Sequence, residues 1–308
     1  MCKLLDLRYK KLKNKVGKEF HSLVIVVEAT MSKYGRLVMV ACALIMILCP
    51  SFVRAAPDEE TKKTWEQASV WIPGKAMGGA HPEWGIMRQS YIQKALSSIS
   101  PEDSLPAVIY LHGCEGINTS SEIDAGMLAG LGFLVVAPSS FAREGRRSNS
   151  RSLGQQEPRA IKFRLEEIEL ALEKLKKIPG VDGNHIFLMG HSEGGEAAAR
   201  FPKTGFAGHI ITGWTCVSLN DKEQPSEHDG LKVPESVPVL AIVASKDPAY
   251  PQENTGPCGQ RMADRSNGRS IVLEENMHWV NGTREARKAI EEFLISNTLT
   301  KIAASKNE

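Results

Sequence analysis

The stretch FLMGHSEGGEAAA (residues 187–199) places Ser192 between Gly190 and Gly194, where an apolar run changes into an alanine-rich one. The G-x-S-x-G pattern is typical of a sharp strand-to-helix turn that exposes a nucleophilic serine. Side chains at positions 190 and 194 would collide with the neighbouring backbone, so glycine is expected at both. The alternative is that Ser192 only caps a helix. Because the flanking segments have the required strand and helix character, we favour the nucleophile.

A serine hydroxyl is a weak nucleophile unless a histidine accepts its proton and an acid holds that histidine in the right tautomer. With this type of turn, the chain order is nucleophile, acid, base. Of the eight histidines, only His278 comes after both Ser192 and the next apolar run that is followed by a candidate acid. It lies within SIVLEENMHWV. His278 is therefore the predicted base, and an ordinary surface histidine is the alternative.

Asp247 is the predicted acid because it follows the apolar run VPVLAIVA, at the expected carboxyl end of a central strand. The alternative is an ordinary Asp-Pro turn with Pro248. Rival carboxylates without a comparable run before them are Asp221, Asp229 and Asp264. The predicted catalytic set is therefore Ser192, Asp247 and His278.

Negative charge that develops on a substrate carbonyl oxygen needs fixed hydrogen-bond donors, each worth about 3 to 4 kcal/mol in comparable sites. One predicted donor is the backbone N–H of Glu193, directly after the nucleophile. The second is expected in the loop LHGCEGIN, where the N–H of Cys114 is the best candidate. In that loop Gly113 permits the turn, and His112 is either a brace or a buried histidine without a direct role.

Six short apolar runs separated by helix-type segments predict a mostly parallel sheet built from right-handed βαβ units. Their nearly unbroken apolar character is typical of strands buried on both faces. The runs are AVIYL (107–111), FLVVA (133–137), HIFLMG (185–190), HIIT (209–212), VLAIVA (239–244) and SIVLE (270–274). The predicted fold class is therefore α/β, with helices on both faces of a mostly parallel central sheet.

The clearest helix spans residues 158–178, starting at a proline, carrying one apolar stripe and ending before a Pro-Gly pair. Its opposite face is expected to be solvated and carries Arg164, Glu167, Lys174 and Lys177. A last helix is predicted over residues 283–299. Residues 57–105 carry no assignable chemistry and contain at most a short helix around residues 90–98.

These motifs and their order resemble the α/β-hydrolase superfamily and, within it, the dienelactone hydrolase family. The resemblance covers roughly residues 106–294, through YLHGCEGI, GFLVVAPSSFAREGR, IPGVDGNHIFLMGHSEGG, ASKDP and NMHW. It implies an α/β-hydrolase fold, with Ser192, Asp247 and His278 at the nucleophile, acid and base positions. The enzymes that give the family its name use a cysteine nucleophile, whereas this chain has serine. The resemblance therefore implies hydrolysis of an ester or lactone, and not of dienelactone in particular.

Two charged features near the predicted site give opposite indications about the substrate. Glu115 and Glu193 would repel an anionic substrate unless their side chains face solvent or basic partners. The run SFAREGRRSNSR (140–151) could bind a substrate carboxylate but is more typical of a solvated loop. Its arginines are Arg143, Arg146, Arg147 and Arg151. No preference for substrate charge follows.

The first 56 residues have the pattern of a secretory leader. The apolar run LVMVACALIMILC (37–49) follows two basic residues and precedes small residues near position 56, and translation from Met31 would give a signal peptide of ordinary length. A membrane anchor through residues 37–53 is the alternative, although a spanning helix needs about 20 apolar residues. We expect an exported protein, periplasmic or secreted.

Export would place the remaining cysteines, Cys114, Cys216 and Cys258, in an oxidising compartment. A disulfide between Cys216 and Cys258 is the preferred pairing. Three unpaired thiols are an equally good interpretation, because sequence alone does not test the geometry.

The composition is that of an ordinary globular protein, with 42% apolar and 24% charged residues and a net charge of +2 over 308 residues. It gives no electrostatic case for a nucleic-acid partner. There is no H-E-x-x-H, paired CxxC or phosphate-loop motif, so we expect no metal or cofactor. The expected organisation is a leader (1–56), an unassigned segment (57–105), one α/β-hydrolase domain (106–299) and a tail (300–308).

The sequence thus predicts a serine hydrolase that acts on a small-molecule ester or lactone and meets a membrane only through an uncleaved leader. The same triad could cleave a peptide bond or transfer an acyl group. A binding protein that keeps the fold without turnover also stays open.

Overall fold

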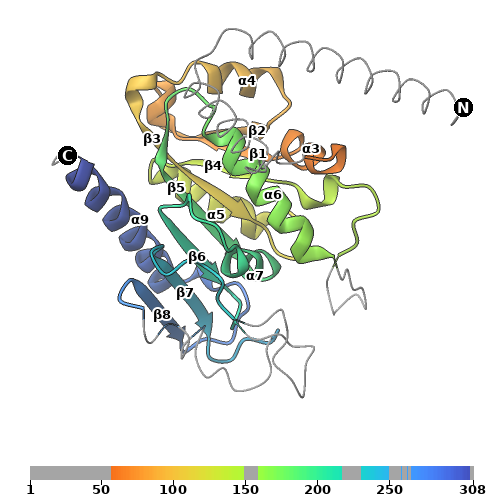
Figure 1. Ribbon diagram of the computed structural model, residues 1–308, viewed down its shortest axis with the longest axis vertical. Coiled ribbons are helices and arrows are strands. Elements are labelled where there is room, and N and C mark those ends of the chain that lie inside the picture. Colours follow the sequence, from red (N-terminus) through yellow and green to blue (C-terminus); the bar gives the residue numbers. More distant parts are fainter. Residues whose placement is uncertain are drawn as a thin grey trace, which may run out of the picture. The chain divides into compact units, whose positions relative to one another are not determined.

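One sheet organises the computed structural model, which describes residues 57–148, 159–216, 230–249, 258, 262 and 265–305. Among these residues, eight strands lie in the order β2-β1-β4-β3-β5-β6-β7-β8 (Figure 1). Strands β3 to β8 are mutually parallel, whereas β1 runs antiparallel to both β2 and β4. The strands are β1 (Ser69–Ile72), β2 (Glu83–Ile86), β3 (Leu105–Leu111), β4 (Leu134–Ala137), β5 (Val181–His191), β6 (Gly208–Thr212), β7 (Val239–Ala244) and β8 (Gly268–Leu273).

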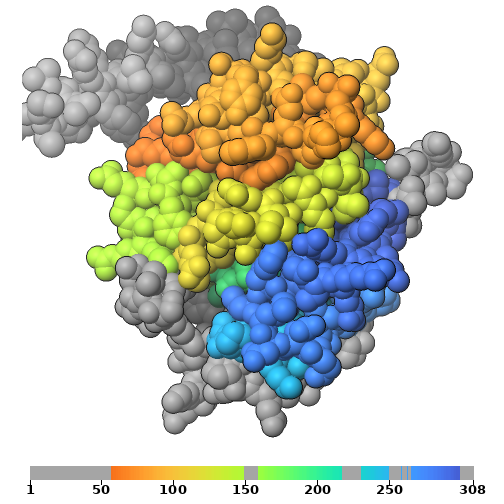
Figure 2. Space-filling model, turned by 180° about the vertical axis from the view of Figure 1, so that it is seen from behind, coloured from red at the N-terminus to blue at the C-terminus, as the bar shows by residue number. Residues whose placement is uncertain are grey.

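Helices cover both faces of this sheet. They are α3 (Glu59–Glu66), α4 (Ser90–Ser97), α5 (Thr119–Gly130), α6 (Ala160–Leu175), α7 (Glu193–Arg200) and α9 (Arg284–Ser305). Apolar side chains of α4, α6 and α7 pack into one buried cluster, and those of α5 and α9 pack into a second. Figure 2 shows the second face, where α5 (yellow) and α9 (blue) lie side by side.

Strand β3 shows why its apolar run is unbroken. Ile109 and Leu111 belong to the first cluster, whereas Val108 and Tyr110 belong to the second. Successive side chains of a strand point to opposite faces, so both faces of this strand are buried and both need apolar residues.

The six predicted strands correspond to β3 through β8, and the fold class is confirmed as α/β. The segment left unassigned, residues 57–105, contains α3, β1, β2 and α4. The last helix continues to Ser305, beyond the predicted end at residue 299. The leader and Arg151 lie outside the described residues. Within the described part of the chain, no helix is long and apolar enough to cross a lipid bilayer.

The expectation of a fully solvated outer face on α6 is wrong. Lys174 and Lys177 are exposed, but Arg164 and Glu167 are fully buried. The two buried charges pair with each other, with 3.3 Å between Arg164 Nη1 and Glu167 Oε2. A charged side chain enters the interior when partners there compensate its charge, and those partners come from other segments of the chain.

His209 makes the fold sensitive to acid. It is buried on β6, where its Nδ1 donates to the Ala198 carbonyl at 2.8 Å, and burial lowers its pKa to about 4. In the unfolded chain the imidazole of His209 takes up a proton near pH 6.5. The free energy of unfolding therefore decreases as the pH falls from about 6.5 towards 4, by up to about 1.4 kcal/mol per pH unit. For His209→Leu, the plot of this free energy, measured by urea titration, against pH should have a slope that is smaller by the equivalent of about one proton over this range. An unchanged slope would contradict this account.

Candidate active site

Ser192 occupies a strained turn between the end of β5 at His191 and the start of α7 at Glu193. Its φ of 56° and ψ of −119° lie outside the regions that a residue with a side chain normally adopts. A Cβ added at Gly190 would collide with the Gly194 carbonyl, and one added at Gly194 would collide with the Leu111 carbonyl. The glycines are therefore needed for the reason that the sequence suggested, and the turn presents the serine hydroxyl at the edge of the sheet.

The three predicted catalytic side chains form one hydrogen-bonded chain. Ser192 Oγ lies 2.8 Å from His278 Nε2, and His278 Nδ1 lies 2.8 and 3.0 Å from the two carboxylate oxygens of Asp247. Asp247 is buried, and one of its oxygens also accepts from the Ala249 N–H at 2.8 Å. The residues follow β5, β7 and β8, whose carboxyl ends meet at one edge of the parallel sheet.

His191 is a member of the site that the sequence analysis did not assign. Its ring lies 4.8 Å from the ring of His278, between centroids. Burial, with a smaller effect of the nearby His278, lowers the pKa of His191 to about 3. His191 is therefore neutral at physiological pH and adds no positive charge beside the predicted base. The only available signal was its place inside the serine motif.

The loop after β3 runs against the nucleophile. A Cβ added at Gly113 would lie 3.5 Å from Ser192 Cβ, so the next residue, Cys114, begins beside the serine. Within the described part of the chain, the backbone N–H groups of Cys114 and Glu193 have no backbone acceptor. These are the two N–H groups that the sequence analysis assigned to a developing oxyanion.

His112 is fully buried under this loop. Its Nδ1 lies 2.7 Å from the Gly113 carbonyl oxygen, and its Nε2 accepts from the Ser140 N–H at 3.2 Å. Burial, reinforced by the Arg164 guanidinium, holds the pKa of His112 well below its usual range. Its two ring nitrogens contact the loop and the segment after β4, so this neutral histidine braces the loop.

A buried ion cluster lies behind the loop and the nucleophile. Glu193 Oε1 accepts from Arg146 Nη2 at 2.6 Å and from Arg164 Nε at 3.2 Å. Arg143 is also buried and pairs with Glu167 and Glu166. The interpretation of Arg143 and Arg146 as solvated residues is therefore wrong, and their guanidinium groups pair with carboxylates of this chain and not with one of a substrate. Arg147 and Glu115 are exposed, as a solvated role requires.

A second buried network holds the loop that carries His278. The Asp124 carboxylate on α5 accepts from Tyr110 at 2.7 Å, from Asn281 at 2.7 Å and from the Trp279 indole at 3.2 Å. Burial raises the pKa of Asp124, while these three donors oppose the rise. Asp124 thus connects the residue after His278 to strand β3.

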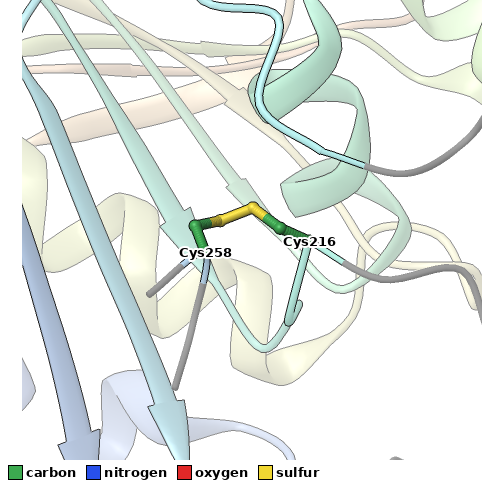
Figure 3. Close-up of a disulfide and its surroundings, with 2 residues drawn as sticks. All are labelled: Cys216 and Cys258. Carbon is green, nitrogen blue, oxygen red and sulfur yellow. A yellow bond between two sulfur atoms is a disulfide. The ribbon is translucent and has the colours of Figure 1, made fainter. Parts of the chain in front are cut away.

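A disulfide joins Cys216 to Cys258, the pair that the sequence analysis preferred (Figure 3). Cys216 follows β6, whose last residue, Thr212, accepts from the Ser192 N–H at 2.9 Å. Cys258 follows the turn that carries Asp247. The bond therefore links the segment beside the nucleophile to the segment after the acid. Cys114 is a free thiol, and burial raises its pKa.

Removing this disulfide should lower stability markedly. It closes a ring between residues 42 positions apart, for which the loss of unfolded-state entropy amounts to about 4 kcal/mol. We expect Cys216→Ala/Cys258→Ala to lower the free energy of unfolding in urea by about that amount. As a matched control, a reducing agent should lower the stability of the parent protein but not of the double variant. Equal unfolding midpoints for parent and variant would refute this prediction.

The described residues contain no group of three or more His, Cys, Asp or Glu side chains placed to hold a metal ion.

A family model, that of the dienelactone hydrolase family, matches residues 94–278. Among solved structures, a sugar hydrolase from Lactococcus lactis is similar with a TM-score of 0.50 and 16% identity, over 64% of this chain and 91% of its own. An esterase from Pyrobaculum calidifontis has a TM-score of 0.46 and 17% identity, over 79% of this chain and 87% of its own. A phospholipase/carboxylesterase from Dyadobacter fermentans has a TM-score of 0.44 and 16% identity, over 64% of this chain and 93% of its own. The first likeness establishes the fold alone. No curated protein matches the chain.

Proposed function

This chain belongs to the dienelactone hydrolase family and is a carboxylic ester hydrolase; on that premise, we propose that it cleaves a small ester or lactone through an acyl-enzyme on Ser192. The observation that carries the proposal is the chain of contacts from Ser192 Oγ through His278 to Asp247, each 3.0 Å or shorter. Such a chain activates a serine hydroxyl at neutral pH.

In the first half-reaction, Ser192 Oγ bonds to the substrate carbonyl carbon while His278 Nε2 takes the hydroxyl proton. The carbonyl oxygen becomes an oxyanion that accepts from the N–H groups of Cys114 and Glu193. As the tetrahedral intermediate collapses, His278 returns the proton to the leaving alkoxide and the ester C–O bond breaks. In a lactone the leaving hydroxyl stays attached to the acyl group.

In the second half-reaction, a water molecule gives a proton to His278 and its oxygen attacks the acyl carbon. The same N–H groups hold the second oxyanion, and His278 protonates Ser192 Oγ as the acid product leaves. Asp247 accepts from His278 Nδ1 throughout and stabilises the imidazolium form of His278. The proton transfers pass between side chains that are already in hydrogen-bond contact.

The test of this function does not require the natural substrate. The mature protein is incubated with a fluorophosphonate, which reacts readily with an activated serine, and the modified peptide is identified by mass spectrometry. A separate sample that has not been treated with the fluorophosphonate is assayed with p-nitrophenyl acetate, a simple lactone and an amide. We expect modification at Ser192 and turnover of the ester or the lactone. An unmodified Ser192 together with no turnover on the panel would overturn the proposal in favour of a binding protein.

We also propose that the mature protein is exported after its leader is removed. The supporting observation is the Cys216–Cys258 disulfide, because such bonds persist in oxidising compartments and are rare in the cytosol. The expected result is an N-terminus near residue 56 or 57 in the exported fraction of the producing cells. A membrane-bound protein that keeps residues 37–53 would overturn cleavage.

A further inference from the structure

The Glu193 side chain presents an electrostatic problem for the proposed reaction. Its backbone N–H is one of the two proposed oxyanion donors, and its carboxylate is buried, with 6% of the residue exposed. A buried negative charge acts through a low dielectric and would oppose a second negative charge on the substrate oxygen. The site therefore needs an arrangement that neutralises Glu193.

Two arginines from different elements supply that arrangement. Arg146 comes from the segment after β4 and Arg164 from α6, and both donate to the same carboxylate oxygen of Glu193. Both arginine side chains are completely inaccessible to solvent. The other carboxylate oxygen, Oε2, has no partner among the described residues. The orientation of Glu193 thus depends on these two guanidinium groups.

Arg164 also contacts the other half of the oxyanion site. Its Nη2 donates to the main-chain carbonyl of His112, one residue before Gly113. A single guanidinium group therefore binds the Glu193 side chain and the backbone that leads to Cys114. The two N–H groups proposed as donors belong to the two segments that Arg164 joins.

The segment of Arg146 encloses the same loop. The Arg146 guanidinium lies 5.1 Å from the centre of the Phe141 ring, and Phe141 in turn stacks on His112. Ser148 Oγ donates to the Cys114 carbonyl at 2.7 Å. A peptide carbonyl shares one plane with the N–H of the next residue. The 2.7 Å contact of the Gly113 carbonyl with His112 Nδ1 therefore restricts the Cys114 N–H, and the contact with Ser148 restricts the peptide that follows.

We propose that Arg146 and Arg164 are positioning residues of the oxyanion site, which neutralise the Glu193 carboxylate and fix the two segments that carry the donating N–H groups. This inference rests on the proposed function and deepens it. If Arg146 and Arg164 served only for stability, their replacement would leave the kcat of the folded enzyme unchanged. As positioning residues, they affect kcat and the binding of a tetrahedral adduct.

The test compares Arg146→Met, Glu193→Gln and their double variant with Arg143→Met as a matched control. Arg143 is buried in the same segment and pairs with Glu167, but it contacts neither Glu193 nor His112. For each variant, kcat and KM are measured on p-nitrophenyl acetate and Ki is measured for phenylboronic acid, which forms an anionic tetrahedral adduct with an active serine. Thermal melting monitors folding.

We expect Arg146→Met to lower kcat about 10²-fold, the size of effect seen when one oxyanion donor is lost, with Ki raised by a similar factor and KM within about threefold. Glu193→Gln in the double variant removes the uncompensated charge and should restore most of the kcat. Arg143→Met should lower the melting temperature but keep kcat within about twofold.

Two results would overturn the inference alone: an Arg146→Met protein with parental kcat and Ki, or a double variant slower than Arg146→Met. If Arg146→Met does not fold, the kcat and the Ki of Glu193→Gln and Arg146→Lys test the inference in its place. Arg146→Lys keeps the positive charge and should retain kcat within about tenfold. A parent that neither turns over the ester nor reacts with a fluorophosphonate would overturn the proposed function and this inference with it.

Discussion

Replacing Ser192 by alanine is expected to lower kcat about 10⁶-fold, the scale seen when the serine of such a triad is removed, while KM stays near the parental value. The reason is that the hydroxyl oxygen 2.8 Å from His278 Nε2 is the atom that forms the acyl-enzyme. The measurement is steady-state hydrolysis of p-nitrophenyl acetate, together with fluorophosphonate labelling, which the variant should not show.

The control for Ser192→Ala is Ser245→Ala, because Ser245 follows β7 at the same edge of the sheet and its hydroxyl donates to Glu274. The control should keep the parental kcat. Ser192→Ala should also keep the parental fold, since alanine retains the Cβ that the turn already accommodates. Turnover by Ser192→Ala within tenfold of the parent would exclude Ser192 as the nucleophile.

The strained turn at Ser192 also affects the stability of the protein. A residue with a side chain in this backbone region costs about 1 to 3 kcal/mol, and glycine tolerates such conformations. The serine is thus held in a conformation that lowers stability, as is common where a reactive group must be presented.

The positions of Ser192, Asp247 and His278 could be predicted because parallel strands bring distant segments together by a simple rule. Each residue follows an apolar run, and the carboxyl ends of parallel strands meet at one edge of the sheet. Once the runs were identified, contacts between residues as far apart as 192 and 278 followed from topology. The chain order of the residues then selected one histidine.

The environment of Glu193 could not be predicted in the same way. Its partners, Arg146 and Arg164, lie 47 and 29 residues away. Helical periodicity indicates which face of α6 is polar, but it does not reveal that another charged segment covers that face. A sequence in which opposite charges compensate inside the protein has the same composition as one with a solvated surface.

Strands β1 and β2 escaped prediction for a different reason. Each has four residues, and the segment between them includes glycines and prolines. β1 pairs antiparallel with β2 and β4 at the edge of the sheet, so no crossover helix marks it. The prediction of β3 to β8 relied on apolar runs and on the helix-type segments between them, and a short antiparallel edge strand has neither.

Replacing Asp247 by asparagine is expected to lower kcat about 10⁴-fold, because the amide holds the histidine in the wrong tautomer. In the parent, both Asp247 oxygens lie within 3.0 Å of His278 Nδ1 and accept its proton, which leaves Nε2 free to take the Ser192 proton. In the variant, the amide nitrogen that faces Nδ1 is a donor, so the proton of the neutral ring moves to Nε2. The measurement is kcat on the same ester.

Asp124→Asn is the matched control, because Asp124 is a second buried aspartate that binds Tyr110, Trp279 and Asn281 and contacts neither Ser192 nor His278. It should lose stability but keep kcat within about tenfold, whereas Asp247→Asn should lose kcat and keep its fold. Both changes replace a buried aspartate by its amide isostere, so a difference in kcat between the two variants reports the proton on His278. If the two variants show equal losses of kcat, Asp247 acts through the local structure and not through the tautomer of His278.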